Sequence, residues 1–114
     1  MALKCDPCAV YAGDLDAEAE LFKALADPHR LRILATLARA SDDVCVCDLT
    51  AGLPLLQPTV SHHLRVLKEA HLVTSERRGT WVYYRLHPKA PARLQAVLEL
   101  VARPLSKRKL KRAV

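Results

Sequence analysis

The chain has 114 residues, enough for one domain with a single core and little room for an active-site cleft between subdomains. Eighteen Lys and Arg residues against twelve Asp and Glu residues give a formal charge of +6, which suits a nucleic acid partner or simply a soluble basic protein. The sequence contains no run of about 18 apolar residues and no apolar core of a signal peptide. We therefore expect a cytoplasmic protein with no membrane partner that is not an enzyme.

Four helices are predicted in the first two thirds of the chain. An amphipathic stretch predicts a helix over 16–26, and a second is predicted over 28–40, with Asp27 as its N-cap and a proline at its first position. A short third helix is expected over 46–51 and a longer fourth helix over 57–70. The short helix, the tight turn and the longer helix together predict a helix-turn-helix.

The predicted helix over 57–70 has two different faces. Val60, Leu64 and Leu67 share the apolar face, and His63 lies near it, so we expect His63 to be structural. The other face carries short or planar polar side chains that can reach base edges and phosphates in a major groove, or that simply face solvent. These candidate DNA-binding residues are Gln57, Thr59, Ser61, His62 and Arg65.

A β-hairpin is predicted over 72–86, because residues rich in β-branched and aromatic side chains flank a glycine-containing turn. Arg77 and Arg78 lie at its tip, where they would contact phosphates or a minor groove, or only solubilise the turn. A last helix is predicted over 91–102 and has a regular apolar stripe. We expect this helix and the first helix to pair across a two-fold homodimer interface.

This order of elements predicts a mainly α fold with a β-hairpin wing, a winged helix-turn-helix. We divide the chain into a flexible N-terminal arm over 1–14, which contains Cys5 and Cys8, a DNA-binding and dimerisation domain over 15–102, and a basic tail over 103–114. The DNA-binding residues would then belong to one compact domain, and two of the four cysteines would lie outside it.

Cys45 and Cys47 stand at the start of the predicted third helix. In a reducing cytoplasm the four cysteines are expected to be thiols or metal ligands rather than disulfides. Residues two apart on an α-helix lie about 200° apart around its axis, so this pair cannot chelate one ion from a regular helix. At a helix end, where the chain is still extended, both sulfurs can reach one soft metal and the helix dipole favours thiolates. Alternatively, both are small buried apolar side chains.

Four segments with recognisable motifs follow one another along the chain: 22–34 (FKALADPHRLRIL), 45–49 (CVCDL), 57–64 (QPTVSHHL) and 79–86 (GTWVYYRL). Through these segments the sequence between residues 16 and 101 resembles the ArsR/SmtB family of metal-sensing repressors. The resemblance implies a homodimer that holds double-stranded operator DNA when metal-free and releases it on binding a toxic metal ion. It fits best with the arsenic-responsive branch and the cadmium- and lead-responsive branch, which carry the Cys-x-Cys signature.

Two thiolates seldom complete a soft-metal site, and this chain has Thr50 where the family pattern sometimes places a third cysteine. The N-terminal arm supplies ligands in the cadmium-responsive branch, which makes Cys5 and Cys8 candidate ligands here. Three sulfurs suit pyramidal arsenite, and four suit tetrahedral cadmium, lead or zinc. The alternatives for the arm are a free terminus or an unrelated redox pair, although a thioredoxin-like dithiol needs a strand before it and only four residues precede Cys5.

The expected function is therefore a repressor released from DNA by a thiophilic metal or metalloid. The segment 79–92 resembles the arsenic branch, and the acidic and His pairs with which zinc sensors bind metal on the last helix are absent, so arsenite, As(III), is the expected inducer. Ligation would distort the start of the helix-turn-helix and reorient its second helix. Two alternatives stay open: a cadmium- or lead-responsive repressor that uses all four cysteines, and a DNA-binding protein with a structural zinc site.

Overall fold

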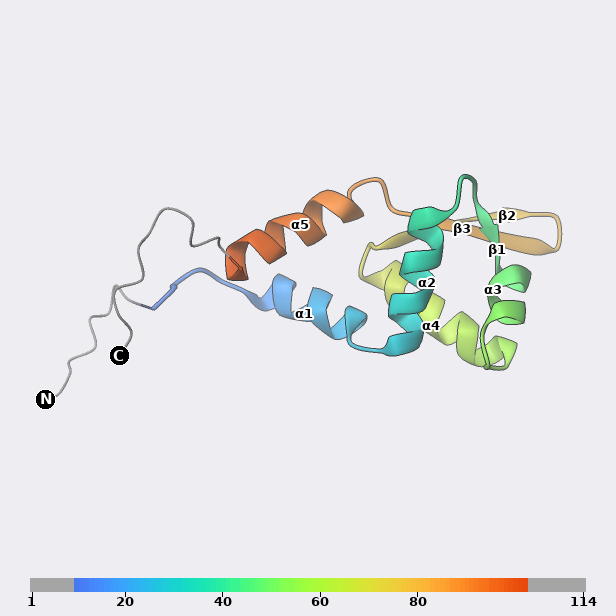
Figure 1. Ribbon diagram of the computed structural model, residues 1–114, viewed down its shortest axis with the longest axis horizontal. Coiled ribbons are helices and arrows are strands. Elements are labelled where there is room, and N and C mark those ends of the chain that lie inside the picture. The colour runs from blue at the N-terminus through green and yellow to red at the C-terminus, as the bar shows by residue number, and fades with distance from the viewer. Residues whose placement is uncertain (1–9, 103–114) are drawn as a thin grey trace, which may run out of the picture.

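The computed structural model describes residues 10–102, which form five helices and a three-stranded antiparallel sheet (Figure 1). This order confirms the predicted winged helix-turn-helix, mainly α with a β-hairpin wing. The proposed arm residues Cys5 and Cys8 and the basic tail over 103–114 lie outside the described residues. In chain order the elements are α1 (Asp16–Leu25), α2 (Pro28–Arg39), β1 (Val44–Cys45), α3 (Val46–Gly52), α4 (Gln57–Glu69), β2 (Val73–Arg78), β3 (Trp81–Leu86) and α5 (Ala90–Val101).

The junction between α1 and α2 forms as the sequence predicts. Asp27 adopts an extended backbone, and its Oδ1 accepts hydrogen bonds from the backbone N–H groups of His29 at 2.8 Å and Arg30 at 3.2 Å. Pro28 occupies the first position of α2, where a missing N–H costs nothing. A side-chain cap of this kind is worth about 1 kcal/mol, so the local sequence fixes the place where α2 begins.

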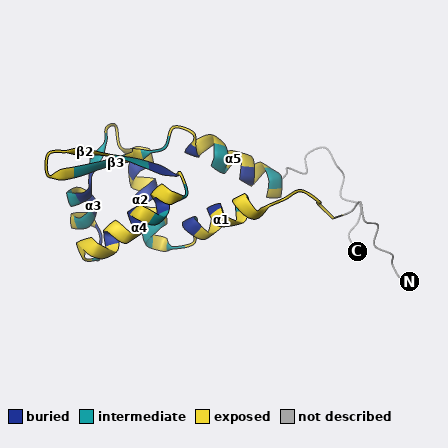
Figure 2. Ribbon diagram, turned by 180° about the vertical axis from the view of Figure 1, so that it is seen from behind, coloured by how far each residue is buried: buried dark blue, intermediate teal, exposed yellow. Residues whose placement is uncertain are grey.

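The core lies where α2, α4 and the start of β2 meet (Figure 2). Val60, Leu64 and Leu67 of α4 are fully buried, which confirms the predicted apolar face. Ile33 of α2 and Val73 of β2 are buried against the same cluster. Helix α3 also packs on α4, and α1 contacts it as well. The position of α4 therefore depends on helices on more than one side of it.

The sheet contains one strand that the sequence analysis missed. β1 pairs antiparallel with β3, with Val44 opposite Tyr84 and Cys45 opposite Tyr83, so the strand order is β1-β3-β2. A strand of two residues is too short to show a period-two pattern, and its partner lies almost 40 residues further along the chain. The predicted hairpin is confirmed as β2 and β3, with Gly79 at φ +66° in the turn between them.

Helices α1 and α5 lie beside each other and extend away from the sheet (Figure 1). Val97 is buried against the core, but Leu98 and Val101 on the same helix are 56% and 64% exposed. Phe22 of α1 is also exposed. This end of the domain therefore presents apolar side chains to solvent. Within residues 10–102 no helix is both long enough and apolar enough to cross a membrane.

Candidate DNA-binding surface and cysteine site

Helix α4 presents its predicted polar face to solvent. The five candidate side chains are exposed, while the opposite face of the same helix is buried in the core. Their arrangement matches what a recognition helix needs, since only exposed polar groups reach base edges and phosphates. Contact with DNA stays a prediction for each of them. The exposed residues are Gln57, Thr59, Ser61, His62 and Arg65.

His63 is buried, as expected of a structural residue. Its Nδ1 accepts a hydrogen bond from Nη1 of Arg30 at 3.1 Å, because a guanidinium donates but does not accept. Nε of Arg30 donates to the carbonyl of Ala24 at 2.7 Å. Burial holds the pKa of His63 below its usual value of 6.5. A neutral His63 therefore joins α4 to the junction of α1 and α2.

The two arginines at the wing tip have different surroundings. Arg77 is exposed, and its nearest polar partner is the carbonyl of Gly79 at 3.5 Å. Arg78 forms an ion pair with Asp43, a second one with Glu76 at 2.9 Å, and places its guanidinium 4.4 Å from the centre of the Tyr83 ring. The charge of Arg78 is thus already compensated within the protein. Sequence reasoning treated the two residues alike because Asp43 lies 35 positions away.

Cys45 and Cys47 lie at the junction of β1 and α3. Cys45 ends the strand and caps the helix with an extended backbone, φ −68° and ψ 142°, and Cys47 lies in the first turn of α3. Cys45 is buried and Cys47 is half-buried. This is the extended helix end that the sequence analysis required for two sulfurs to reach one ion. Its position at the start of the helix-turn-helix is as predicted.

The two sulfurs are joined as a disulfide, with Cα atoms 5.1 Å apart. The sequence analysis expected thiols or metal ligands rather than disulfides, and the structure instead holds this pair as a disulfide. The reason is local geometry: the extended backbone at Cys45 turns both side chains to the same side, at a Cα separation usual for disulfides. Two reduced thiolates placed in this way would also converge on one soft ion, so the donor set fits a dithiol-binding metal or metalloid. Metal binding by the two cysteines in their reduced form stays a prediction.

Further ligands are missing from this part of the chain. Among residues 10–102 no group of three or more His, Cys, Asp or Glu side chains converges on a possible ion. Thr50, at the position of a potential third cysteine, donates its hydroxyl to the carbonyl of Val46 at 2.9 Å. The described residues thus offer two sulfurs, and a further ligand would have to be a sulfur of Cys5, Cys8 or a partner subunit, or an oxygen from solvent.

Residues 27–75 match the family described as bacterial regulatory protein, arsR family. The homodimeric winged helix-turn-helix DNA-binding domain of a possible ArsR-family transcriptional regulator from Mycobacterium bovis is 33% identical in sequence. Its solution structure aligns over 99% of this chain and 100% of that one, with a TM-score of 0.63. The chain belongs to the ArsR family of bacterial regulatory proteins. ArsR-family members are transcription regulators and not enzymes.

Two regulators of arsenic resistance are also similar to this ArsR-family chain. The arsenic resistance transcriptional regulator ArsR1 of Pseudomonas putida is 47% identical over 79 residues, which cover 69% of this chain and 61% of that protein. The arsenical resistance operon repressor of Escherichia coli K12 is 45% identical over 73 residues, which cover 64% of this chain and 62% of that protein. The chain thus spans less than two thirds of the length of either protein.

Proposed function

We propose that the chain is a homodimeric repressor that binds operator DNA through α4 and the wing and releases it when As(III) binds Cys45 and Cys47. The observation that carries this proposal is the position of the cysteine pair at the first turn of α3, the helix that packs on α4. A ligand held there acts on the element that supports the DNA-binding surface. Because such a regulator acts on DNA, it works in the cytoplasm.

DNA binding is supported by the polar face of α4 together with the charge of the chain. An exposed set of short donors and Arg65 on a helix-turn-helix suits a major groove. The formal charge of +6 favours a polyanion. The similar Mycobacterium bovis domain is described as homodimeric and DNA-binding, which agrees with this assignment.

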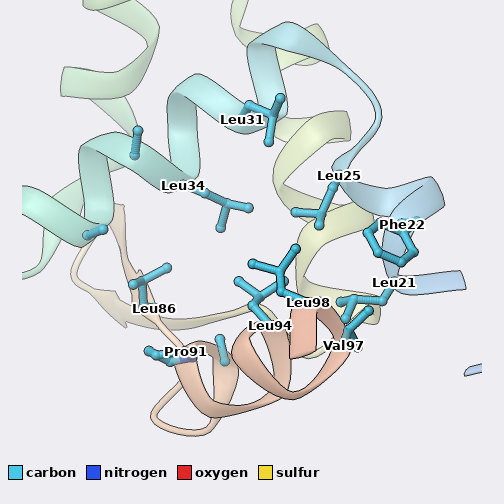
Figure 3. A pocket seen from close by; sticks show the side chains of 13 residues that line it. Leu21, Phe22, Leu25, Leu31, Leu34, Leu86, Pro91, Leu94, Val97 and Leu98 are labelled. Carbon is cyan, nitrogen blue, oxygen red and sulfur yellow. The ribbon is translucent and has the colours of Figure 1, made fainter. Parts of the chain in front are cut away.

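A homodimer is supported by an apolar groove between α1, α2 and α5 (Figure 3). The groove has a volume of about 450 Å³, and Phe22, Leu25 and Leu94 are among the side chains that point into it. Exposed Leu98 and Val101 continue the apolar surface on α5. The same two helices of a second copy would cover this surface and remove it from water, at about 25 cal/mol for each Å² buried.

Arsenite suits the cysteine pair for chemical reasons. As(OH)₃ exchanges hydroxide ligands for thiolates, releasing water as each As–S bond forms, and two converging sulfurs hold it as a chelate. A dithiol reductant must first cleave the disulfide, giving two electrons and two protons and itself becoming a disulfide, because the joined sulfurs offer no thiolate to arsenic. The backbone N–H of Cys47 lies 3.2 Å from the sulfur of Cys45, where it also stabilises a negative charge. We assign the third ligand to Cys5 or Cys8.

Release of the operator follows from the position of the bound arsenic between β1 and α3. Joining Cys45 and Cys47 through arsenic, with two As–S bonds between the sulfurs, changes the separation of the end of β1 and the first turn of α3. Because α3 packs on α4, such a change shifts the recognition helix away from the orientation that fits the groove. The inducer therefore acts by binding the released conformation more tightly than the DNA-bound one.

The test uses an operator duplex that the metal-free protein selects from a random library. Fluorescence anisotropy then measures its affinity with and without arsenite, under reducing conditions. Cys45→Ser and Cys47→Ser should bind the duplex within about threefold of wild type and no longer release it. Normal release by both variants would refute the proposal. Cys5→Ser or Cys8→Ser should weaken the response to arsenite, since a two-sulfur site leaves one arsenic bond to solvent.

The same titration with cadmium, lead and zinc separates the alternatives. A repressor that needs all four cysteines should respond to cadmium or lead and lose that response in Cys5→Ser and Cys8→Ser alike. A structural zinc site would make chelation lower the unfolding temperature, whereas an inducer site should leave a folded, DNA-binding protein after chelation.

A further inference from the structure

Asp43 joins both strands of the wing hairpin, which consists of β2, β3 and their turn. Its side chain is only 11% exposed, and the carboxylate accepts one hydrogen bond from Nη2 of Arg78 on β2. The other carboxylate oxygen forms an ion pair with Nε of Arg85 on β3 at 3.5 Å. We call Asp43, Glu76, Arg78 and Arg85 the Asp43 cluster. Within residues 10–102 one ion pair lies outside this cluster, between Lys23 and Glu20, whose side chains are 74% and 72% exposed. Partial burial makes the Asp43 contacts stronger than that exposed pair, because water screens them less.

The Asp43 cluster lies on the same face of the sheet as Cys45. Paired residues on neighbouring antiparallel strands share a face, and Cys45 pairs with Tyr83, which in turn pairs with Glu76. Side chains two residues apart in a strand also share a face, which adds Arg78 on β2 and Arg85 on β3. The guanidinium of Arg78 covers the Tyr83 ring and reaches back to Asp43, two residues before Cys45.

We propose that Asp43 is a positioning residue that couples Cys45 and Cys47 to the wing hairpin, so that the inducer moves the wing as well as α4. This inference rests on the proposed function. Ligation that shifts Cys45 also shifts Asp43, because only Val44 separates them and Asp43 directly precedes the strand β1, which pairs with β3. Asp43 then pulls on Arg78 at the tip, and the adjacent exposed Arg77 changes its position relative to the DNA backbone. Asp43 thus connects the cysteine pair to the wing hairpin by a route that does not pass through α4.

The chain carries its own probe of the wing. Trp81 is the only tryptophan in the sequence, begins β3, is 49% exposed and pairs with Arg78. Arsenite added to reduced, DNA-free protein should form As–S bonds, visible as ultraviolet absorbance, and should change Trp81 emission with the same midpoint. Absence of the absorbance would contradict the proposed function. Absorbance with unchanged Trp81 emission would overturn the coupling through Asp43 while leaving the proposed function intact.

Variants then isolate the coupling. Asp43→Asn should keep arsenite affinity within about twofold, lose most of the Trp81 response, and reduce the arsenite-induced drop in operator affinity roughly tenfold. Asp43→Glu, which keeps the carboxylate, should restore part of both responses. Glu20→Gln removes the exposed ion pair with Lys23 and should behave like wild type.

A merely structural Asp43 would lower the unfolding temperature without changing the ratio of operator affinities with and without arsenite, and that result would refute the coupling. Should Asp43→Asn fail to fold, Arg78→Gln is measured in its place with the same expected losses. The wild-type Trp81 titration needs no variant and decides by itself whether the wing responds to ligation.

Discussion

Apolar side chains are buried at one end of the domain and partly exposed at the other. Around α4 the apolar face is fully buried within one chain, and the exposed face is polar. Around α1 and α5 a regular apolar stripe remains partly exposed, and a groove of about 450 Å³ lies open beside it. At the α4 end, one chain buries its own apolar side chains and leaves a polar surface that suits a nucleic acid. At the α1 and α5 end, only contact with another apolar surface would bury the exposed side chains.

The largest effect is expected at the α1 and α5 end. Leu98→Asp should place an unpaired charge in the dimer interface and raise the dimer dissociation constant by about 100-fold, which corresponds to roughly 3 kcal/mol. Ala92→Asp, at an exposed position on the opposite side of α5, is the matched control and should dimerise normally. Sedimentation equilibrium measures both. A wild-type protein that is monomeric at micromolar concentration would contradict the assignment of the α1 and α5 end as a dimer interface.

At the other end, the exposed face of α4 should control operator affinity and leave dimerisation unchanged. Ser61→Ala, His62→Ala and Arg65→Ala should each weaken operator binding by about 1–3 kcal/mol, because each removes a donor in the groove. Arg32→Ala, at an exposed position on α2, serves as the control for loss of one positive charge. Unchanged affinity in all three variants, measured by fluorescence anisotropy, would place the DNA-reading surface on another element.

The wing tip gives a smaller and more specific effect. Arg77→Ala should weaken operator and random DNA alike and flatten the salt dependence of binding by about one unit of slope, as expected when one phosphate contact is lost. Arg78→Ala should change this slope less, because Asp43 and Glu76 already compensate its charge. Anisotropy titrations over a range of salt concentrations compare the two. Equal slopes for both variants would show that the ion pairs do not withdraw Arg78 from DNA.

The smallest effect is a pH dependence of the free energy of unfolding, caused by His63, which joins α4 to the junction of α1 and α2. Burial lowers the pKa of His63 in the folded protein, so the unfolded chain binds a proton first as pH falls. The contribution of His63 to stability is therefore complete above pH 6.5 and is lost as pH falls below it. Urea unfolding at pH 8 and pH 5 should show this loss in wild type. The loss should be smaller in His63→Gln than in the exposed control His62→Gln, and an equal loss in both would contradict it.

Much of this architecture is readable from local patterns. Asp27 and Pro28 mark the start of α2 because capping and the geometry of proline act over a few residues. Val60, Leu64 and Leu67 identify the buried side of α4 because helical periodicity is a local property. The exposure of the five polar α4 residues and the position of Cys45 at a helix end follow from the same kind of reasoning.

What tertiary structure decided depends on residues far apart in the sequence. The two-residue strand β1 exists only because β3 offers it hydrogen-bonding partners, and no period can be read from two residues. The compensated charge of Arg78 and the partly buried carboxylate of Asp43 arise from a contact across 35 positions. A sequence thus determines where helices start and which side they bury, whereas only the fold determines that Arg78, and not the adjacent Arg77, forms ion pairs with Asp43 and Glu76.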